Sequence, residues 1–381
     1  MSDLASVGLL MKVFPPGVVD EVIARCGRTE QRRRALPARS VAYFTMGMAL
    51  HSHGSYHDVL SLVSDGMAWA DRDEVRRRLA NKAAISHARD RLGPEPMRGL
   101  FERVAVPLAA RDAPGSWLAG RWLVTIDGTC LDLADTPANR AHFGRPAVLE
   151  GEPAPFPQAR VVAVAECGTN AIFDAAVGRY TTSESTLSED LLARLTPGTL
   201  CLDDRGRYSR TAWETASRTG AHLLWRVADN RPLDFVTELP DGSYLAEMLE
   251  PHAARHPRHP RRVRVIEQVE AGAGRKGDRQ RLITTLLDPD EASAAELTAA
   301  HGRRWELDAA LDELRTGRSR PRPALRSRSP DLVVQEIWGH LCCHYAIRTL
   351  LVPTTPDRPG PARSLVRRGV GPASDGTSPA R

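Results

Sequence analysis

Two short apolar runs decide the fold: RWLVTID at residues 121–127 and TLCLDD at residues 199–204. Each has the length and the β-branched or leucine content of a buried strand, and each ends in aspartate. Between them, residues 159–178 (ARVVAVAECGTNAIFDAAVG) predict two strands around a Cys-Gly-Thr-Asn turn. Residues 183–192 (SESTLSEDLL) then predict a helix with a capping serine. The order strand, hairpin, helix, strand indicates an α/β sheet, with Asp127-Gly128 as a turn that ends the first strand.

The sequence on either side of this core has different hydrophobic patterns. Helical periodicity covers residues 15–112, β-type alternation covers 221–288, and helical periodicity resumes at Ser293 and again over 331–350. We therefore predict an α/β (α+β) protein of five parts. They are a helical N-terminal domain (1–114), which is a DNA-binding domain if the resemblance described below holds, the first part of a core (115–220), a β-rich insertion (221–290), the helical second part of the core (291–352) and a disordered basic tail (353–381).

The composition is that of a soluble globular protein. The 381 residues are 42% hydrophobic and 26% charged, and no apolar run approaches the roughly 18 residues that a membrane helix needs. The six cysteines lack metal-binding spacings, which favours reduced thiols and a cytoplasmic protein. A net charge of +5 is compatible with a polyanionic partner.

The two strand-terminal aspartates are candidate metal ligands. If the two strands are neighbours, Asp127 and Asp204 come close enough to share hard divalent cations such as Mg²⁺, which prefer oxygen ligands. Two metal ions about 3.5–4 Å apart can promote phosphodiester cleavage, and such a site usually needs a third carboxylate. Asp308 offers one, because Arg304, Asp308 and Arg315 fall on one face of the helix predicted there. Plain turn chemistry and a surface ion-pair ladder remain alternative interpretations.

Three segments carry a family resemblance: IDGT (126–129), LDDRGRYS (202–209) and RRWELDAALDELR (303–315). Together they resemble the DDE transposases of the bacterial insertion-sequence-four group, whose signature is Y-(2)-R-(3)-E-(6)-K. The resemblance extends over residues 15–350 in consistent order. It implies a ribonuclease-H-like catalytic core with a β-rich insertion, preceded by a helical N-terminal domain.

The resemblance also assigns roles by position. Asp127, Asp204 and Asp308 take the places of the catalytic, metal-binding carboxylates. Arg304 takes the arginine place, whereas His301 stands where tyrosine is expected, Asp308 where glutamate is and Arg315 where lysine is. The residues expected to bind DNA or phosphate are His301, Arg304, Arg315, Arg318, Arg326 and Arg328. Trp225 and Trp305 are interpreted as core residues, with base stacking as the alternative, and Glu306 as a solvated helix charge.

These observations lead to one main functional hypothesis. The chain is expected to cut and join insertion-sequence ends with two Mg²⁺ ions, for which Mn²⁺ can substitute. Its partners would be double-stranded DNA with terminal inverted repeats, target DNA and a second copy, with no membrane, in a cytoplasmic, nucleoid-associated setting. Aspartate in the third carboxylate place and an aberrant C-terminus leave open an impaired copy. Two further hypotheses are a non-catalytic DNA-binding relic of a transposase and a ribonuclease-H-like nuclease.

Overall fold

A mixed ten-stranded sheet forms the centre of the protein. The computed structural model describes residues 3–32, 36–70, 81–147, 154–204, 208–248, 261–269, 279–316 and 324–352. The predicted tail, 353–381, lies outside these residues. The first five strands of the sheet path are β2 (Arg121–Asp132), β3 (Gln158–Glu166), β4 (Ile172–Arg179), β5 (Thr199–Asp203) and β6 (His222–Val227), and the short β1 (Trp117–Leu118) pairs with β2.

The order of these strands confirms the predicted ribonuclease-H-like fold. They lie in the order β4-β3-β2-β5-β6, in which β2, β3 and β4 are antiparallel neighbours and β5 and β6 run parallel to β2. Helices α8 (Glu184–Leu192) and α9 (Arg210–Arg218) connect β4 to β5 and β5 to β6. The predicted hairpin, the helix with its capping Ser183 and the second buried strand are all present.

One predicted turn is wrong. Asp127 and Gly128 do not end a strand, because β2 continues to Asp132 and pairs with β3 along that length, Asp127 opposite Ala163 and Gly128 opposite Val162. Asp-Gly is common in turns, but here the antiparallel partner supplies backbone hydrogen bonds that keep the segment extended. What ends near Asp127 is the pairing of β2 with β5.

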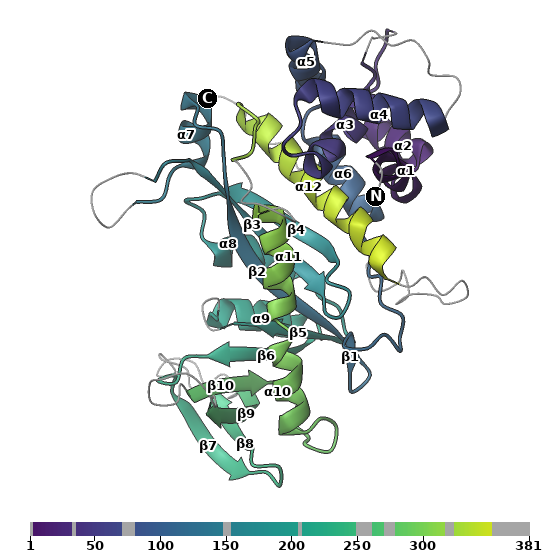
Figure 1. Ribbon diagram of the computed structural model, residues 1–381. Coiled ribbons are helices and arrows are strands. Elements are labelled where there is room, and N and C mark those ends of the chain that lie inside the picture. The colour runs from purple at the N-terminus through teal and green to yellow at the C-terminus, as the bar shows by residue number, and fades with distance from the viewer. Residues whose placement is uncertain are drawn as a thin grey trace, which may run out of the picture.

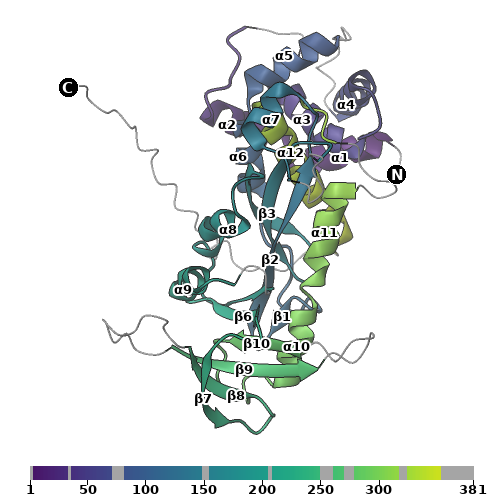
Figure 2. The same ribbon diagram turned by 90° about the vertical axis from the view of Figure 1, so that its left-hand side faces the viewer.

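The β-rich stretch continues the same sheet. Strand β6 pairs with β10 (Arg279–Thr284), which is followed in space by β9 (Arg261–Val269), β8 (Tyr244–Met248) and β7 (Leu233–Glu238). The predicted boundary at residue 221 therefore separates two parts of the sequence that share one sheet. The predicted domain limits stay a prediction. Figure 2 shows α8 and α9 on one face of the sheet and α10 (Ala294–Gly302) and α11 (Trp305–Thr316) on the other.

Helices from both ends of the chain pack together beside the sheet. Helix α12 (Pro330–Leu351) runs between the sheet and the N-terminal helices and contacts α3, α6 and β4 (Figure 1). At its crossing with α3, a Cβ added to Gly339 would lie 2.8 Å from the carbonyl oxygen of Thr45, so only glycine permits this approach. The N-terminal helices are α1 (Asp3–Val13), α2 (Pro16–Arg25), α3 (Ala38–Leu50), α4 (Tyr56–Ala70), α5 (Lys82–Leu92) and α6 (Glu95–Val104), and a short α7 (Pro137–Phe143) follows β2.

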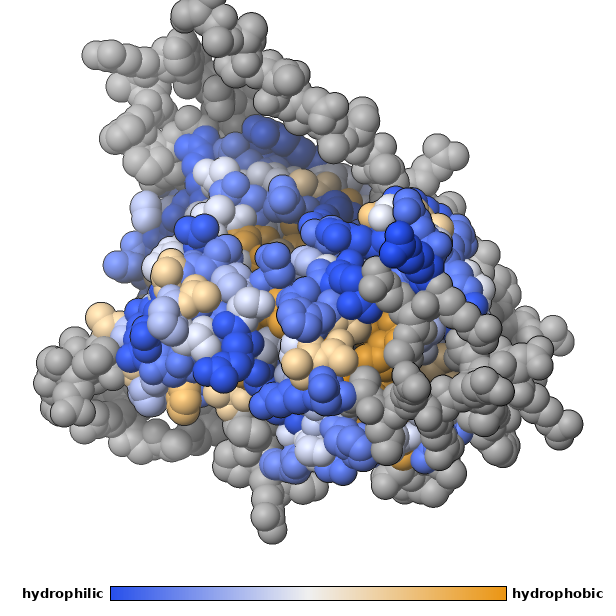
Figure 3. Space-filling view, turned by 90° about the horizontal axis from the view of Figure 1, so that it is seen from above, coloured by the Kyte–Doolittle hydropathy of each residue, from blue (hydrophilic) through white to orange (hydrophobic). Residues whose placement is uncertain are grey.

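A buried polar cluster joins α12 to the N-terminal helices. Arg89 of α5, only 1% exposed, donates to Gln335 Oε1, to Ser327 Oγ and to the carbonyl oxygen of Leu332. Seen from above, the described surface is mainly hydrophilic, with hydrophobic residues in small patches (Figure 3). Within the described chain, we find no helix with both the length and the hydropathy to cross a bilayer.

Candidate active site

The register of the sheet brings Asp127 and Asp204 together. Strands β2 and β5 run parallel, with Thr125 opposite Leu202 as their last pair. Asp127 and Asp204 each lie two residues beyond that pair, and neighbouring strands are about 4.8 Å apart. The two aspartates therefore occupy adjacent positions where β5 ends.

Both carboxylates lie on the face of the sheet that α10 and α11 cover. Leu123, Leu200 and Leu202 pack in one cluster with Leu297 and Ala300 of α10. Since side chains alternate along a strand, Asp127 shares the face of Leu123 and Asp204 that of Leu202. Asp203, opposite Trp225 in the register of β5 and β6, faces the other side of the sheet.

Arg304 makes a close charged contact with one residue of this pair, Asp204. Its Nη1 lies 3.0 Å from Oδ2 of Asp204, and its side chain is almost fully buried, with 4% of the residue exposed. Its guanidinium carbon lies 4.4 Å from the centroid of the Trp305 ring, within the range of a cation–π interaction. A second guanidinium, from Arg226 of β6, has Nη1 at 4.0 Å from Oδ1 of Asp204. Asp204 thus lies between two cations.

The predicted helix around Arg304 is interrupted. Helix α10 ends at Gly302 and α11 begins at Trp305, so Arg303 and Arg304 form a turn between two helices rather than one continuous face. Glycine at 302 is a poor helix former, which is a physical reason for a break at this point. The turn lets the Arg304 side chain reach inward to Asp204. In a single straight helix, Arg304 and Asp308 would instead lie on the same face, four residues apart.

His301 is used inside the fold. Only 5% of the residue is exposed, and Nε2 lies 3.1 Å from the carbonyl oxygen of Asp203, to which the neutral ring can donate. Burial, together with the nearby Arg304 charge, lowers its pKa to about 4. A phosphate contact from this residue stays a prediction, since the hydrogen bond in the structure goes to the backbone.

Asp308, the predicted third carboxylate, lies in the first turn of α11, which packs against β2. It is half-buried. In the described part of the chain, no three or more His, Cys, Asp or Glu side chains are grouped closely enough to hold a metal ion. Asp127 and Asp204 are oxygen donors at adjacent positions and so fit a hard divalent cation. The joining of Asp308 to them stays a prediction.

The predicted arginine contacts to DNA have different surroundings. Arg315 belongs to α11, but its side chain, like all of Arg318, lies outside the described residues. Arg326 is half-buried, with Nη1 2.5 Å from the carbonyl oxygen of Gly54 and its guanidinium 5.0 Å from the Tyr56 ring centroid. Arg326 therefore links the segment that precedes α12 to the connection between α3 and α4 in the N-terminal helices. Arg328 is exposed.

Two interpretations of single residues are corrected. Glu306 is not a solvated charge, because Oε2 accepts from the backbone N–H of Gly168 at 2.6 Å and Oε1 from Arg303 at 2.8 Å. Trp305 is not a core residue, since 64% of it is exposed, whereas Trp225 is buried as expected. Arg226 was also missed in the sequence analysis. Leu224 pairs with Leu202, and Arg226 lies two residues after Leu224, as Asp204 lies two residues after Leu202. This equal spacing was the available signal that Arg226 lies beside Asp204.

Known proteins resemble this chain in sequence. Residues 4–102 match the family model described as insertion element 4 transposase N-terminal. Over 339 residues the chain is 29% identical to "Transposase InsG for insertion sequence element IS4" of Escherichia coli (strain K12), covering 88% of this chain and 75% of that protein. It is 25% identical over 224 residues to "Putative transposase InsZ" of the same organism, covering 58% of this chain and 71% of the relative.

A solved structure is also similar in part. The piggyBac transposase in a synaptic complex with hairpin DNA aligns with 90% of this chain and 74% of its own, at 11% sequence identity and a TM-score of 0.42.

Proposed function

We propose that this chain is a transposase of the insertion-sequence-four family and that it cuts and joins the ends of an insertion sequence by divalent-metal-dependent phosphoryl transfer. The observation that carries the proposal is the adjacency of Asp127 and Asp204 on one sheet face, with Arg304 against Asp204. Two carboxylates beside a buried arginine combine cation-binding groups with a phosphate-binding group.

Each residue has a proposed task. Asp127 and Asp204, joined by Asp308 from α11, would hold two Mg²⁺ ions, or Mn²⁺ in their place. Bound Mg²⁺ supplies positive charge that stabilises the transition state of in-line phosphoryl transfer. Arg304 would bind a phosphate next to the scissile bond, where its planar donors suit two oxygens at once.

The groups around the carboxylates extend this site. The exposed Trp305 ring, backed by the Arg304 guanidinium, offers a flat face on which an unpaired base at the cut end can stack. His301 and the arginines Arg315, Arg318, Arg326 and Arg328 are the further candidate contacts to flanking DNA.

The proposed partners follow from the reaction. The substrate would be double-stranded DNA with terminal inverted repeats, followed by target DNA. A homodimer on DNA would hold two ends together, in a cytoplasmic, nucleoid-associated complex.

A cleavage assay with matched variants tests the function. We expect the protein to cut DNA that carries the element's terminal repeats in the presence of Mg²⁺ or Mn²⁺ and to be inactive with EDTA. Asp127→Asn and Asp204→Asn should each lower the cleavage rate about 100-fold or more. Asp132→Asn is the matched control, because Asp132 is the exposed last residue of the same strand as Asp127. Equal activity of Asp127→Asn and Asp132→Asn would contradict the proposal.

The same assay distinguishes an active enzyme from an impaired or non-catalytic one. Aspartate is one methylene shorter than the glutamate of the family signature. This difference favours an impaired enzyme or a non-catalytic DNA-binding relic as the second candidate. Activity that appears only in Asp308→Glu identifies the impaired enzyme. Repeat binding without cleavage by either protein identifies the relic, and cleavage without sequence preference identifies a nuclease.

A further inference from the structure

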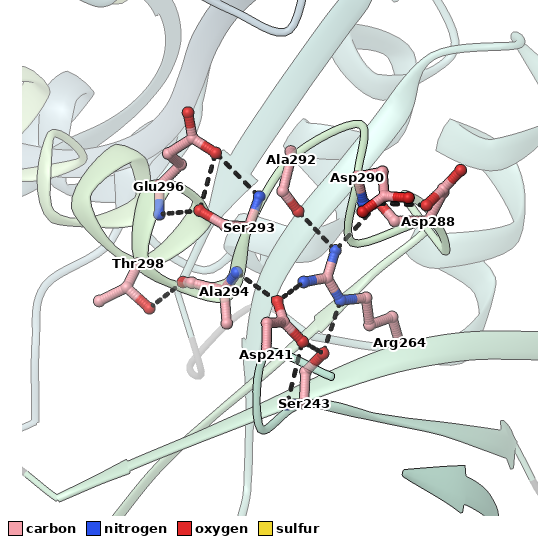
Figure 4. Close-up of polar contacts among 10 residues, drawn as sticks. All are labelled: Asp241, Ser243, Arg264, Asp288, Asp290, Ala292, Ser293, Ala294, Glu296 and Thr298. Carbon is pink, nitrogen blue, oxygen red and sulfur yellow. Dashed lines mark hydrogen bonds and ion pairs between the residues drawn. The ribbon is translucent and has the colours of Figure 1, made fainter. Parts of the chain in front are cut away.

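A fully buried arginine lies far in the sequence from the candidate site. Arg264 of β9 has 0% exposure and is surrounded by acceptors (Figure 4). Its Nε donates to Ser243 Oγ at 2.8 Å, its Nη1 to the carbonyl oxygen of Ala292 at 2.6 Å, and its Nη2 pairs with Asp241. An arginine so enclosed is costly unless its donors are satisfied, so the contacts form one unit.

Asp241 connects this arginine to the start of α10. Its Oδ2, which pairs with Arg264, also accepts the backbone N–H of Ala294, the first residue of the helix, at 2.7 Å. Its Oδ1 accepts Ser243 Oγ at 2.5 Å. Burial opposes ionisation of Asp241, but these hydrogen bonds and the Arg264 charge outweigh it and lower the pKa of Asp241. The aspartate is therefore held as an anion at the positive end of a helix.

Helix α10 is fixed at both ends. At its start, Ser293 and Glu296 form a reciprocal capping box. Its nine residues correspond to about 13 Å of rigid helix. At its end, His301 bonds to the carbonyl oxygen of Asp203, and the following Arg304 pairs with Asp204. A shift at the base of the helix would thus be carried to the carboxylates.

We propose that Arg264 and Asp241 are positioning residues, which clamp the base of α10 to the β-rich insertion and so set where Arg304 meets Asp204. The catalytic consequence rests on the proposed function, whereas the mechanical link does not. Through Arg264 and Asp241, strand β9 and the β7–β8 turn would help to set the geometry of the candidate site, although neither contains one of the proposed metal ligands.

The experiment compares two buried arginines. Arg264→Lys keeps the charge but removes the planar donors that reach Ser243 and Ala292 together. Arg89→Lys is the matched control, because Arg89 is also almost fully buried and also donates several hydrogen bonds, but it belongs to α5 and bonds to α12 instead of α10. Both full-length variants are compared at equal residual stability, set by denaturant.

Hydrogen exchange gives the readout that does not depend on activity. We expect amides of α10 and of the 303–304 turn to exchange about 10-fold faster in Arg264→Lys and to be unchanged in Arg89→Lys. Asp241→Asn should give the same pattern, and the double variant should add little to it, because the two residues share one interaction. Equal exchange of this segment in Arg264→Lys and Arg89→Lys would overturn the proposal, whether or not the protein is a transposase.

Kinetics then tests the catalytic consequence. In Arg264→Lys we expect single-turnover cleavage about 100-fold slower, as a displacement of about 1 Å can cause. The Mg²⁺ concentration for half-maximal rate should rise, while affinity for the DNA end stays within about 3-fold of wild type. A cleavage rate and Mg²⁺ dependence equal to those of Arg89→Lys would refute this consequence. Absence of cleavage by the wild type would instead contradict the proposed function and leave the exchange result to decide the clamp.

Discussion

At the scale of single residues, Arg304 would compete with a divalent cation for the carboxylate of Asp204, if this residue is the metal ligand that we propose. In Arg304→Gln the nearer of the two positive charges beside Asp204 is gone and only Arg226 is left, so Mn²⁺ should bind several-fold more tightly in the absence of DNA. DNA cleavage should nevertheless slow, because the phosphate loses its proposed partner. Calorimetry with Mn²⁺ measures the first effect. Arg303→Gln is the control, since Arg303 pairs with Glu306 instead; the same Mn²⁺ affinity in both variants would contradict the competition.

His301 makes a second prediction, for pH. Its pKa is about 4 in the folded protein against an ordinary value of 6.5, so the unfolded chain binds the proton more readily between these values. Its contribution to stability is therefore complete above pH 6.5 and declines as the pH falls towards 4. His301→Gln, which can still donate to the carbonyl oxygen of Asp203, should weaken this part of the pH dependence by an amount on the order of 1–3 kcal/mol. Denaturant unfolding at pH 7 and pH 4.5 measures it, and parallel pH profiles would disprove it.

The sequence predicts some residues of the site better than others. Asp127 and Asp204 were predicted to come close if their strands are neighbours, and the pairing of β2 with β5 meets that condition, although Asp127 does not end its strand. Arg226 and Glu306 could not be recognised in the same way, since their contacts to Asp204 and Gly168 come from distant segments. The turn predicted at Asp127-Gly128 was wrong, because the turn propensity of Asp-Gly is a local property and the pairing with strand β3 keeps this segment extended.

At the scale of elements, the crossing of α3 and α12 depends on one missing side chain. Gly339→Ala places a Cβ 2.8 Å from the carbonyl oxygen of Thr45, and backbone atoms must move to accept it. We expect a loss of about 1–3 kcal/mol in the free energy of unfolding. Gly8→Ala in α1 has no atom within 4 Å of the new Cβ and should be neutral or stabilising. Chemical denaturation of both variants checks this, and equal stability would disprove the tight crossing.

Elements were predictable where periodicity and caps agree. Ser183 and Ser293 mark helix starts that the structure contains, and Ser329-Pro330 marks the start of α12. The break at residues 303–304 was not predicted, because apolar periodicity continues through it. Gly302 weakens the helix locally, and the contact that the turn allows between Arg304 and Asp204 comes from a distant segment.

At the scale of the whole molecule, α12 holds two apolar surfaces together. Its buried side chains include Ile337, Trp338, Leu341 and Tyr345, and α3 and α6 are among the helices packed against it. A chain that begins at residue 105 should therefore expose this helix, aggregate and bind a hydrophobic dye. Light scattering of the fragment against the full chain is the measurement. A monomeric fragment with wild-type thermal unfolding would show that the N-terminal helices are dispensable for folding.

The complete ten-stranded sheet could not be predicted from hydrophobic patterns. Four strands of the core were predicted separately from the β-rich stretch, in which the sequence analysis included β6. The two parts are joined by the parallel pairing of β5 with β6, and β6 then pairs with β10 through residues far apart in the sequence, such as Trp225 and Ile283. Contacts at such separation leave no periodic mark in either segment.

The central place of α12 also has a consequence for synthesis. Ribosomes complete residues 330–351 after all the other described elements, so the six N-terminal helices emerge long before the helix that fills the gap between them and the sheet. Until then their inward surfaces have no partner, which makes the nascent polypeptide a client for chaperones. A chain that stops ahead of residue 330 would therefore lack the helix that packs against both the N-terminal helices and strand β4 of the sheet.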